Sequence, residues 1–332
     1  MSAGWRDVSP LRNRGALLTA GELRKAAAGY NGAMRPEYTW RLRERELKLG
    51  ERTVIMGVLN VTPDSFSEAG LHFSPPAAVE HGLRLLEEGA DILDIGGEST
   101  RPGAKVGDKG VSAEEELRRI LPVIGQVLHH QRDAVISVDT YKASVARAAC
   151  QAGAQIVNDI SGGRWDRAMP VAMAELKCGV VLMHTRGRPD EWRNLPRLGG
   201  NELLALIKRE LCACAESAMS AGVERERMVL DPGFGFGKNF GENFALLARF
   251  GELHSLGFPL LAGTSRKSFI GRALARQGKD LAPTERLFGS VATATAAILA
   301  GAHIVRAHDV RPTVEAARVA DEILKSGNRE IG

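Results

Sequence analysis

The feature that most constrains this fold is a rhythm that repeats eight times between residues 54 and 308. Short apolar runs rich in β-branched residues alternate with longer amphipathic stretches. Runs that are apolar throughout indicate strands covered on both faces, as in a parallel sheet. The expected strands are VIMGVLN (54–60), DILDIG (91–96), AVISVD (134–139), AQIVND (154–159), VVLMH (180–184), RMVLD (227–231), PLLAG (259–263) and HIVRAH (303–308).

Eight strand–helix units in succession favour one closed (β/α)8 barrel, a TIM barrel, over an open Rossmann sheet. An open dinucleotide-binding sheet would need a glycine-rich fingerprint after its first strand, and none follows residue 60. We expect residues 38–328 to form the barrel and residues 1–37 to form a flexible N-terminal extension. Alternation of apolar and charged residues over 39–49 (TWRLRERELKL) predicts a strand or a β-hairpin at the start of the barrel domain.

Charge and cysteine usage exclude several classes of protein. The positive surplus lies in residues 1–50, with ten basic and five acidic residues, and its scattered placement indicates a solvated segment that binds neither nucleic acid nor a membrane. The chain has no run of about 18 uncharged apolar residues and no signal peptide at its start. Four cysteines without metal-binding spacing (Cys150, Cys178, Cys212 and Cys214) are expected to be free thiols in a reducing cytoplasm.

The functional clue is the polar residue near the C-terminal end of nearly every expected strand. In a barrel these ends converge on one rim, where this fold places its active sites. One polar strand end is explained by a turn or a helix cap, whereas a whole series is not. The series consists of Asn60, Asp94, Asp139, Asn158, His184, Asp231, Arg306 and His308.

These residue types indicate the chemistry of the ligands. Carboxylates such as Asp139 and Asp231 pair bidentately with the N–C–NH2 edge of a flat heterocycle. The cations of the same region, Lys267 and Arg306 with Arg101 and Arg266, indicate an anionic partner such as a phosphate or a carboxylate. Residues 264–268 (TSRKS) lead from the seventh strand into a helix and are expected to form an anion site.

Two local patterns have simpler explanations than a nucleotide or a metal site. Residues 233–238 (GFGFGK) resemble a P-loop, but that motif would need a glycine at Pro232 and a hydroxyl at Asn239. The segment therefore predicts a tight rim loop whose backbone approaches a ligand, or else a purely structural turn. His308 and Asp309 lack a third metal ligand of suitable spacing, so His308 is expected to contact a phosphate.

Eight segments of the chain resemble the signature segments of the dihydropteroate synthase family, in the order found in that family. The resemblance covers residues 40 to 320, and it implies a pterin-binding TIM barrel of folate biosynthesis. The implied reaction condenses 6-hydroxymethyl-7,8-dihydropterin pyrophosphate with p-aminobenzoate by an SN1-like transfer, which yields 7,8-dihydropteroate and pyrophosphate. The segments are GVLNVTPDSFSEAG (57–70), DIGGESTRPGA (94–104), ISVDTYK (136–142), VNDISGG (157–163), LMHTRG (182–187), LDPGFGFGKN (230–239), GTSRKSFIG (263–271) and IVRAHDV (304–310).

The resemblance also implies roles for individual residues. Those matching the catalytic positions are Asp139, Lys267, Arg306 and His308, and Asn60 matches the residue that holds Mg²⁺. Further implications are a homodimer and a target for sulfonamides. The matched pterin-binding positions are Asp139, Asn158, Met183, Asp231, Gly235, Phe236, Gly263 and Lys267, the pyrophosphate positions are Asn60, Arg306 and His308, and the p-aminobenzoate positions are Thr100, Arg101, Pro102 and Ser268.

One departure and two alternatives complete the prediction. Residues 105–110 (KVGDKG) lengthen the second of two loops, 61–73 and 96–112, that are expected to close over the site and exclude water.

A methyltetrahydrofolate:corrinoid methyltransferase would share the acids, but it need not keep residues 265–267 or the Arg306–His308 pair. A regulatory homologue without activity would be expected to lose Asn60, Lys267 or Arg306. All of these residues are present, which favours the synthase.

Overall fold

The structure, a computed structural model, describes residues 35–62, 75–99, 106 and 110–326, and its central feature is a parallel barrel. The strands follow the order β8-β7-β6-β5-β4-β3-β10-β9, and a parallel bridge between Leu230 and Leu260 closes the ring. Across this closure the Leu230 amide donates to the Pro259 carbonyl at 2.9 Å. The predicted single (β/α)8 barrel is therefore confirmed. Its strands are β3 (Val54–Asn60), β4 (Ile92–Gly96), β5 (Val135–Asp139), β6 (Ile156–Asp159), β7 (Gly179–Met183), β8 (Met228–Asp231), β9 (Leu261–Ala262) and β10 (Ile304–Ala307).

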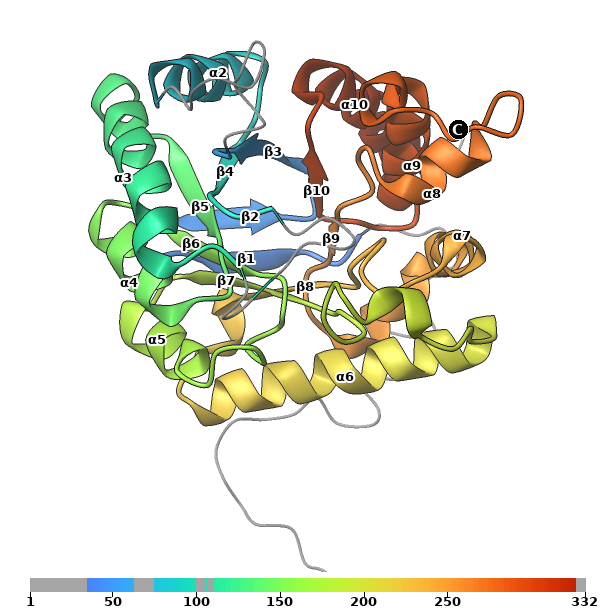
Figure 1. The fold of residues 1–332 in the computed structure, drawn as a ribbon, viewed down its shortest axis with the longest axis horizontal. Helices are drawn as coiled ribbons and strands as arrows, with labels where there is room; N and C mark the ends of the chain where they lie inside the picture. Colours follow the sequence, from blue (N-terminus) through green and yellow to red (C-terminus); the bar gives the residue numbers. More distant parts are fainter. Residues whose placement is uncertain (1–34, 63–74, 100–105, 107–109, 327–332) are drawn as a thin grey trace, which may run out of the picture.

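Helices form a ring around the barrel in Figure 1, and their apolar faces pack onto the outside of the strands. A 3₁₀ segment (Phe250–Leu256) follows α7 (Phe240–Ala248), so the amphipathic stretch over 242–257 is not one continuous α-helix. This change of pitch lets Phe250 be fully buried, where it stacks on Phe234. The helices are α2 (Pro75–Glu87), α3 (Ala113–His130), α4 (Ala143–Gln151), α5 (Met169–Leu176), α6 (Gly200–Ser220), α7 (Phe240–Ala248), α8 (Ser268–Ala273), α9 (Leu287–Leu299) and α10 (Val310–Ser326).

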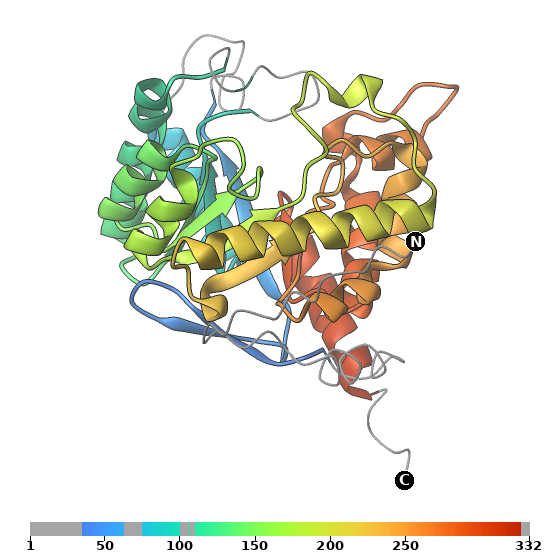
Figure 2. The same ribbon diagram turned by 90° about the horizontal axis from the view of Figure 1, so that it is seen from below.

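A hairpin closes the lower end of the barrel, where the strands begin (Figure 2). Strands β1 (Tyr38–Arg41) and β2 (Glu46–Leu49) pair antiparallel, so the alternation over 39–49 corresponds to a hairpin. Trp40 is fully buried, and its indole N–H donates to the Arg227 carbonyl at 2.8 Å. Trp40 shares a core cluster with the first inward-facing residues of the barrel strands, which include Met56 and Ile304. The lower end is therefore filled by apolar side chains and covered by the hairpin.

The packed part of the described chain begins before residue 38, the start expected from the sequence. Arg35 is buried and hydrogen-bonds to Thr53 Oγ1 at 2.8 Å and to the Ala302 carbonyl at 2.9 Å. It also forms an ion pair with Asp321 of α10. The rest of the expected extension, residues 1–34, lies outside the described residues.

Two predictions based on composition can be compared with the structure. All four cysteines are free thiols, as expected. Over the ranges that the structure describes, no helix combines the length and the apolar composition needed to span a membrane.

Candidate active site

The barrel register brings polar residues to one level at the rim, which we define as the C-terminal ends of the barrel strands. Asn60 of β3 lies opposite Gly96 of β4, Gly96 lies opposite Asp139 of β5, and Asp139 lies opposite Asn158 of β6. Parallel strands in a closed barrel share this end, so residues up to 98 positions apart in the chain become neighbours. The rim faces away from the hairpin (Figure 2).

Arg306 joins two carboxylates across the inside of the barrel. Its Nε donates to Asp94 Oδ2 at 2.6 Å, and its NH2 group donates to Asp139 Oδ2 at 2.7 Å. Asn158 Nδ2 donates to the same Asp94 oxygen at 3.0 Å, while the buried Asp94 Oδ1 has no hydrogen-bond partner among the described residues. Four predicted rim residues thus form one connected polar network.

Burial moves the pKa values of three rim side chains toward neutral pH. Loss of solvation raises the pKa of Asp139 to about 7, although Arg306 opposes the shift. The pKa of Asp231 rises to about 6 for the same reason, opposed by the hydrogen bond from the Gly233 amide. Burial and the Arg306 charge lower the pKa of Lys267 to about 8. Groups that titrate this close to neutral pH in a cleft are typical of functional sites.

The glycine-rich loop over 232–239 brings an aromatic ring under a lysine. Lys267 Nζ lies 4.1 Å from the centre of the Phe236 ring, in cation–π geometry. At Gly235, which has φ +84°, an added Cβ would lie 3.3 Å from Lys267 Cδ. The loop is tight, and only glycine suits the backbone conformation and close approach at position 235. The approach of its backbone to a ligand stays a prediction.

Two further predicted residues lie beside this loop. Met183 ends β7 and belongs to a small apolar cluster that contains Phe236 and Tyr141. Gly263 follows β9, and an added Cβ there would lie 3.8 Å from Asp231 Oδ2 and 3.9 Å from Arg306 Cβ. Both residues therefore border the space in which Asp231, Lys267 and Arg306 meet.

The segment after β9 supplies a second polar corner. Ser265 Oγ lies 3.1 Å from His308 Nδ1 and accepts from the His308 amide at 3.1 Å. Arg266, a non-glycine residue with φ +57°, holds Asp309 with two hydrogen bonds. Ser268 is exposed and opens α8 directly after Lys267. His308 and Ser268 therefore lie on the same side of the rim as Lys267.

Some predicted residues do not join this arrangement. His184 follows β7 but turns toward α6, where its Nε2 lies 3.4 Å from Glu210 Oε2, and burial lowers its pKa to about 3. Thr100, Arg101 and Pro102 lie outside the described residues, as do most of the two expected closing loops and residues 105 and 107–109 of the lengthened segment. Within the described ranges, no group of three His, Cys, Asp or Glu side chains could hold a metal ion.

Sequence reasoning missed two functional candidates. Asp94 counted only as a polar strand end, yet it is the shared acceptor of Arg306 and Asn158. Lys238, at the end of the glycine-rich loop, is buried, and burial lowers its pKa to about 7. The signal for Lys238 was present in the sequence. A lysine that directly follows three glycines at alternate positions has a side chain long enough to fold back onto the carbonyls of that loop.

Comparisons with known proteins agree with this geometry. The profile of the family described as pterin binding enzyme matches residues 56–308. The dihydropteroate synthase of Synechocystis sp. is 45% identical over 276 residues, which cover 83% of this chain and 92% of that protein. The structure of Xanthomonas albilineans dihydropteroate synthase with 4-aminobenzoic acid is 44% identical with a TM-score of 0.77, covering 87% of this chain and 98% of the other. The Yersinia pestis dihydropteroate synthase in a sulfonamide drug complex is 41% identical with a TM-score of 0.78, covering 87% and 100%.

Fold and family profile together define the class, a pterin binding enzyme built on a closed α/β barrel. Identities above 40% over more than four-fifths of the chain narrow this class further. The chain belongs to the dihydropteroate synthase family.

Proposed function

We propose that this enzyme joins p-aminobenzoate to the methylene carbon of 6-hydroxymethyl-7,8-dihydropterin pyrophosphate and releases 7,8-dihydropteroate and pyrophosphate. The observation that carries the proposal is the placement of Asp231 and Arg306 beside Gly263, with the Lys267 charge close enough to interact with both, at the rim of a barrel from this family. An acid, an amine and a guanidinium in one buried space suit a heterocycle that carries an anionic leaving group.

Binding of the pterin is assigned to the groups around Asp231. The ionised Asp231 carboxylate accepts two parallel N–H groups from the aminopyrimidine edge, and Asn158 extends the polar contact. The Lys267 ammonium donates to the ring carbonyl while it lies over Phe236. Met183, Gly235 and Gly263 form the walls, and their small or apolar character leaves room for a flat ring.

The departing pyrophosphate is assigned to Arg306 and His308. Arg306 has five N–H donors, and the structure uses two of them on Asp94 and Asp139, so others remain for phosphate oxygens. His308 lies at the same end of β10 beside Ser265. Positive charge directed at the leaving group stabilises the negative charge that develops there.

Asn60 is the residue of this chain that would hold Mg²⁺ against the pyrophosphate. Asn60 is half-buried at the end of β3, and its amide oxygen is a ligand type that Mg²⁺ accepts. One protein oxygen together with phosphate oxygens is a usual arrangement for Mg²⁺ on a phosphate substrate. When bound, the ion neutralises charge on the pyrophosphate. Chelation is expected to reduce turnover, and Asn60→Ala should raise the Mg²⁺ concentration needed for half-maximal rate.

The transfer itself follows from charge. The bond between the pterin methylene carbon and the pyrophosphate oxygen breaks first, and its electron pair leaves with the pyrophosphate. The electron-rich pterin spreads the positive charge left on carbon, and the Asp139 carboxylate supplies a nearby negative charge. The arylamine nitrogen then forms the new C–N bond and loses a proton. The p-aminobenzoate is assigned to Ser268 and to Thr100, Arg101 and Pro102, with Ser268 near its carboxylate.

The reaction is tested with purified protein, the pterin pyrophosphate, p-aminobenzoate and Mg²⁺. Stoichiometric pyrophosphate and 7,8-dihydropteroate are the expected products, measured by a coupled phosphate assay and by chromatography. Omission of p-aminobenzoate should remove the dihydropteroate. Absence of both products from the complete mixture would reject the proposal. Added sulfonamide, as a p-aminobenzoate analogue, should compete with that substrate.

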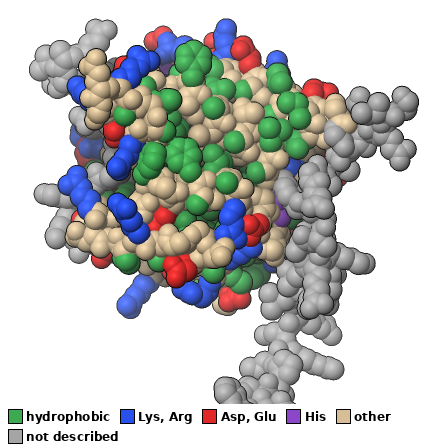
Figure 3. All heavy atoms as spheres, turned by 90° about the vertical axis from the view of Figure 1, so that its right-hand side faces the viewer, with side chains coloured by type: hydrophobic (Ala, Val, Ile, Leu, Met, Phe, Trp, Pro, Cys, Tyr) green, Lys and Arg blue, Asp and Glu red, His purple; other side chains and the backbone are tan. Residues whose placement is uncertain are grey.

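We also propose that the protein is a homodimer and that an apolar face over α8, α9 and α10 forms its interface. Phe288 is 85% exposed, Val319 63%, Ile323 53% and Leu274 40%. Figure 3 looks onto this side of the molecule and shows hydrophobic side chains gathered across it. Exposed apolar patches of this kind mark protein–protein interfaces. Light scattering should give twice the chain mass, and Phe288→Asp should give the monomer.

A cytoplasmic location is the remaining proposal. Its support is the four free thiols, which a reducing compartment maintains. Cell fractionation with an antibody against the chain tests it.

A further inference from the structure

A buried lysine in the glycine-rich loop has no part in the reaction described above. Lys238 is 6% exposed, and its Nζ lies 2.8 Å from the Gly233 carbonyl oxygen and 3.2 Å from that of Phe236. A third carbonyl, that of His184, lies at 3.4 Å. The protonated form of Lys238 has three N–H donors, and these three carbonyls accept all of them. Lys238 therefore holds backbone and presents no N–H group to a substrate.

The loop needs such support because of its backbone conformation. Gly233, Gly235 and Gly237 have φ values of +69°, +84° and +68°. This alternation turns successive carbonyls out of any regular ladder, and buried carbonyls without partners are costly. Lys238 satisfies two carbonyls of the loop and ties them to the end of β7 through His184. Lys238 is therefore one of the side chains that fix the shape of the loop.

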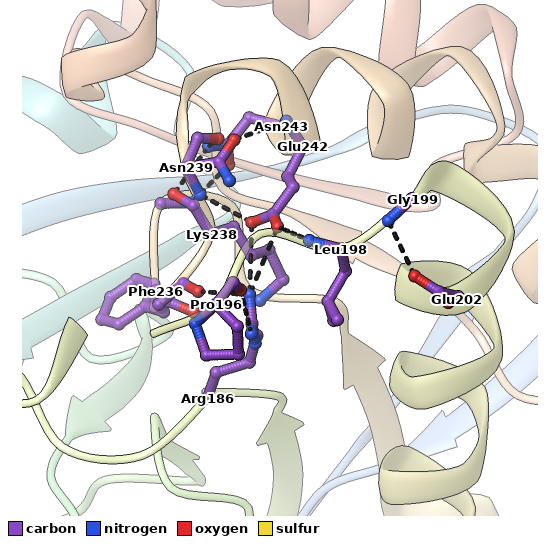
Figure 4. Close-up of polar contacts among 12 residues, drawn as sticks. Arg186, Pro196, Leu198, Gly199, Glu202, Phe236, Lys238, Asn239, Glu242 and Asn243 are labelled. Atoms are coloured by element: carbon purple, nitrogen blue, oxygen red, sulfur yellow. Dashed lines mark hydrogen bonds and ion pairs between the residues drawn. The ribbon is translucent and has the colours of Figure 1, made fainter. Parts of the chain in front are cut away.

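Asn243 of α7 holds the same loop through other backbone groups. Its Oδ1 accepts from the Gly235 amide at 2.7 Å, and its Nδ2 donates to the carbonyls of Lys238 at 3.1 Å and Asn239 at 2.6 Å. Figure 4 shows Lys238, Asn239 and Asn243 converging beside Phe236. Asn243 is only 1% exposed, so these bonds are shielded from water.

An ion pair braces the outer side of this arrangement. Arg186 NH1 lies 3.3 Å from both the Gly237 carbonyl oxygen and Glu242 Oε2. Glu242 in turn accepts from the Asn239 amide at 2.8 Å and from the Leu198 amide at 2.7 Å (Figure 4). The loop is therefore fixed from three directions by side chains that are themselves buried.

The loop matters because of what it places against the site. Phe236 lies under the Lys267 ammonium, and the space above Gly235 is filled by the Lys267 side chain. A shift of the loop by about 1 Å would move the ring away from the amine, and misplacement of this size can cost about 100-fold in rate.

We propose that Lys238, supported by Asn243, is a positioning residue for the pterin side of the active site. It holds the loop over 232–239 so that Phe236 and Gly235 lie against Lys267, and it touches neither substrate. The inference rests on the proposed synthase reaction. It adds to that reaction a residue, Lys238, that acts through Phe236, Gly235 and Lys267.

The first test compares two matched substitutions. Lys238→Met removes the ammonium and keeps a similar length, and it is expected to raise KM for the pterin pyrophosphate by about 10- to 100-fold. KM for p-aminobenzoate, measured at saturating pterin, should change by less than about threefold. The control is Arg227→Met, because Arg227 is also 6% exposed and donates to two backbone carbonyls, those of Leu42 and Lys177, at the lower end. The control should lower Tm and leave both KM values unchanged.

A double substitution distinguishes positioning from general loosening. If Lys238 acts through Phe236, then Lys238→Met in a Phe236→Ala background should add less than about threefold to the pterin KM, since coupled residues are not additive. Independent, multiplicative effects would overturn the inference. So would an unchanged pterin KM in Lys238→Met, or an equal rise in both KM values.

Two outcomes need separate treatment. If Lys238→Met does not fold, Asn243→Ala takes its place, with the same selective rise in pterin KM expected and the same results overturning the inference. If the wild-type enzyme forms no dihydropteroate, the proposed function fails first. Direct titration of the pterin pyrophosphate by calorimetry then decides the inference alone, because the Lys238→Met protein should bind it about 10-fold or more weakly and equal affinity would reject it.

Discussion

The two ends of the barrel bury charged groups in opposite ways. At the lower end each buried cation has complete partners: Arg35 pairs with Asp321, and Arg227 donates to two backbone carbonyls. At the rim Arg306 is shared between two carboxylates, and Lys267 lies over an aromatic ring. Fully partnered charges fix a structure, whereas shared charges can be redirected to a ligand. The comparison indicates that Arg35 and Arg227 at the lower end are structural cations, whereas Arg306 and Lys267 at the rim are available to a ligand.

The pKa shifts follow the same division. At the lower end burial lowers the pKa of His303 to about 3, so this side chain stays neutral at physiological pH. At the rim the pKa values of Asp139 and Lys267 move to about 7 and about 8. Near pH 7 His303 therefore keeps its charge state, whereas Asp139 and Lys267 at the rim titrate close to this pH.

The largest effect is expected for Lys267→Ala. Loss of the ammonium removes a cation aimed at the bound ring, and turnover should fall by about 1,000-fold, in the range seen when a directed donor is deleted. Pyrophosphate release measures the fall in turnover. The thermal unfolding temperature should shift little, because the side chain lies at the rim of the barrel. Wild-type rates would remove Lys267 from the site.

Trp40→Ala tests the opposite end. Trp40 is fully buried under the hairpin, so the substitution leaves a cavity and should lower the free energy of unfolding by about 3–5 kcal/mol. Urea denaturation measures the loss, and both KM values of the folded fraction should match the wild type. A large change in either KM would mean that the two ends are not separable.

Asp231→Asn should change the pH dependence of the unfolding free energy and should also weaken pterin binding. Because folding raises the Asp231 pKa from 3.8 to about 6, the folded state binds the proton more tightly, and this contribution is present below about pH 4 and lost as the pH rises through 6. The substitution should therefore stabilise the protein by about 2 kcal/mol more at pH 7 than at pH 4. Pterin affinity should fall at pH 7. A pH-independent difference in unfolding free energy contradicts the assignment.

His303 gives the reverse sign at the lower end. Its lowered pKa means that its contribution to stability is present above about pH 6.5 and decreases as the pH falls toward 3. Wild-type unfolding curves therefore combine two opposed trends, and the Asp231→Asn difference isolates the one from the rim.

Gly263→Ala should give the smallest effect. The added methyl group meets Asp231 and Arg306 only at ordinary contact distances, so unfolding free energy should change by less than about 1 kcal/mol. The methyl group narrows the pterin space, and KM for the pterin should rise by about tenfold or less. Gly235→Ala is the contrasting variant, because its φ of +84° adds backbone strain. Equal effects at both positions would contradict this account of the loop.

Much of the fold was predictable because its signals are local. Apolar runs marked all eight barrel strands, with ends displaced by one or two residues in most cases, and alternation over 39–49 marked the hairpin. The expected strand over 259–263 is only Leu261–Ala262 in the structure, since its partner positions on β10 are two residues. The break after α7 could not be predicted from the sequence, because it depends on burying Phe250 against Phe234, a contact that periodicity does not contain.

The sequence could predict which residues lie on the rim, but not which of their side chains bond to one another. Strand ends in a barrel must converge, so Asp139, Asn158 and Asp231 could be placed on one rim from the sequence. Which carboxylates Arg306 takes depends on a side chain that reaches across the barrel to residues more than 160 positions away. The burial of Lys238 depends likewise on the His184 carbonyl, 54 positions earlier in the chain.

The ion pair between Arg35 and Asp321 also bears on how the barrel could be rebuilt. It joins the first described residue to the last described helix at the lower end, beside the hairpin. A circular permutant that covalently links these two segments and opens the chain in an exposed helix connection would keep every strand in its present neighbourhood. The rim of such a permutant would depend on the order of the barrel units around the ring and not on their order along the chain.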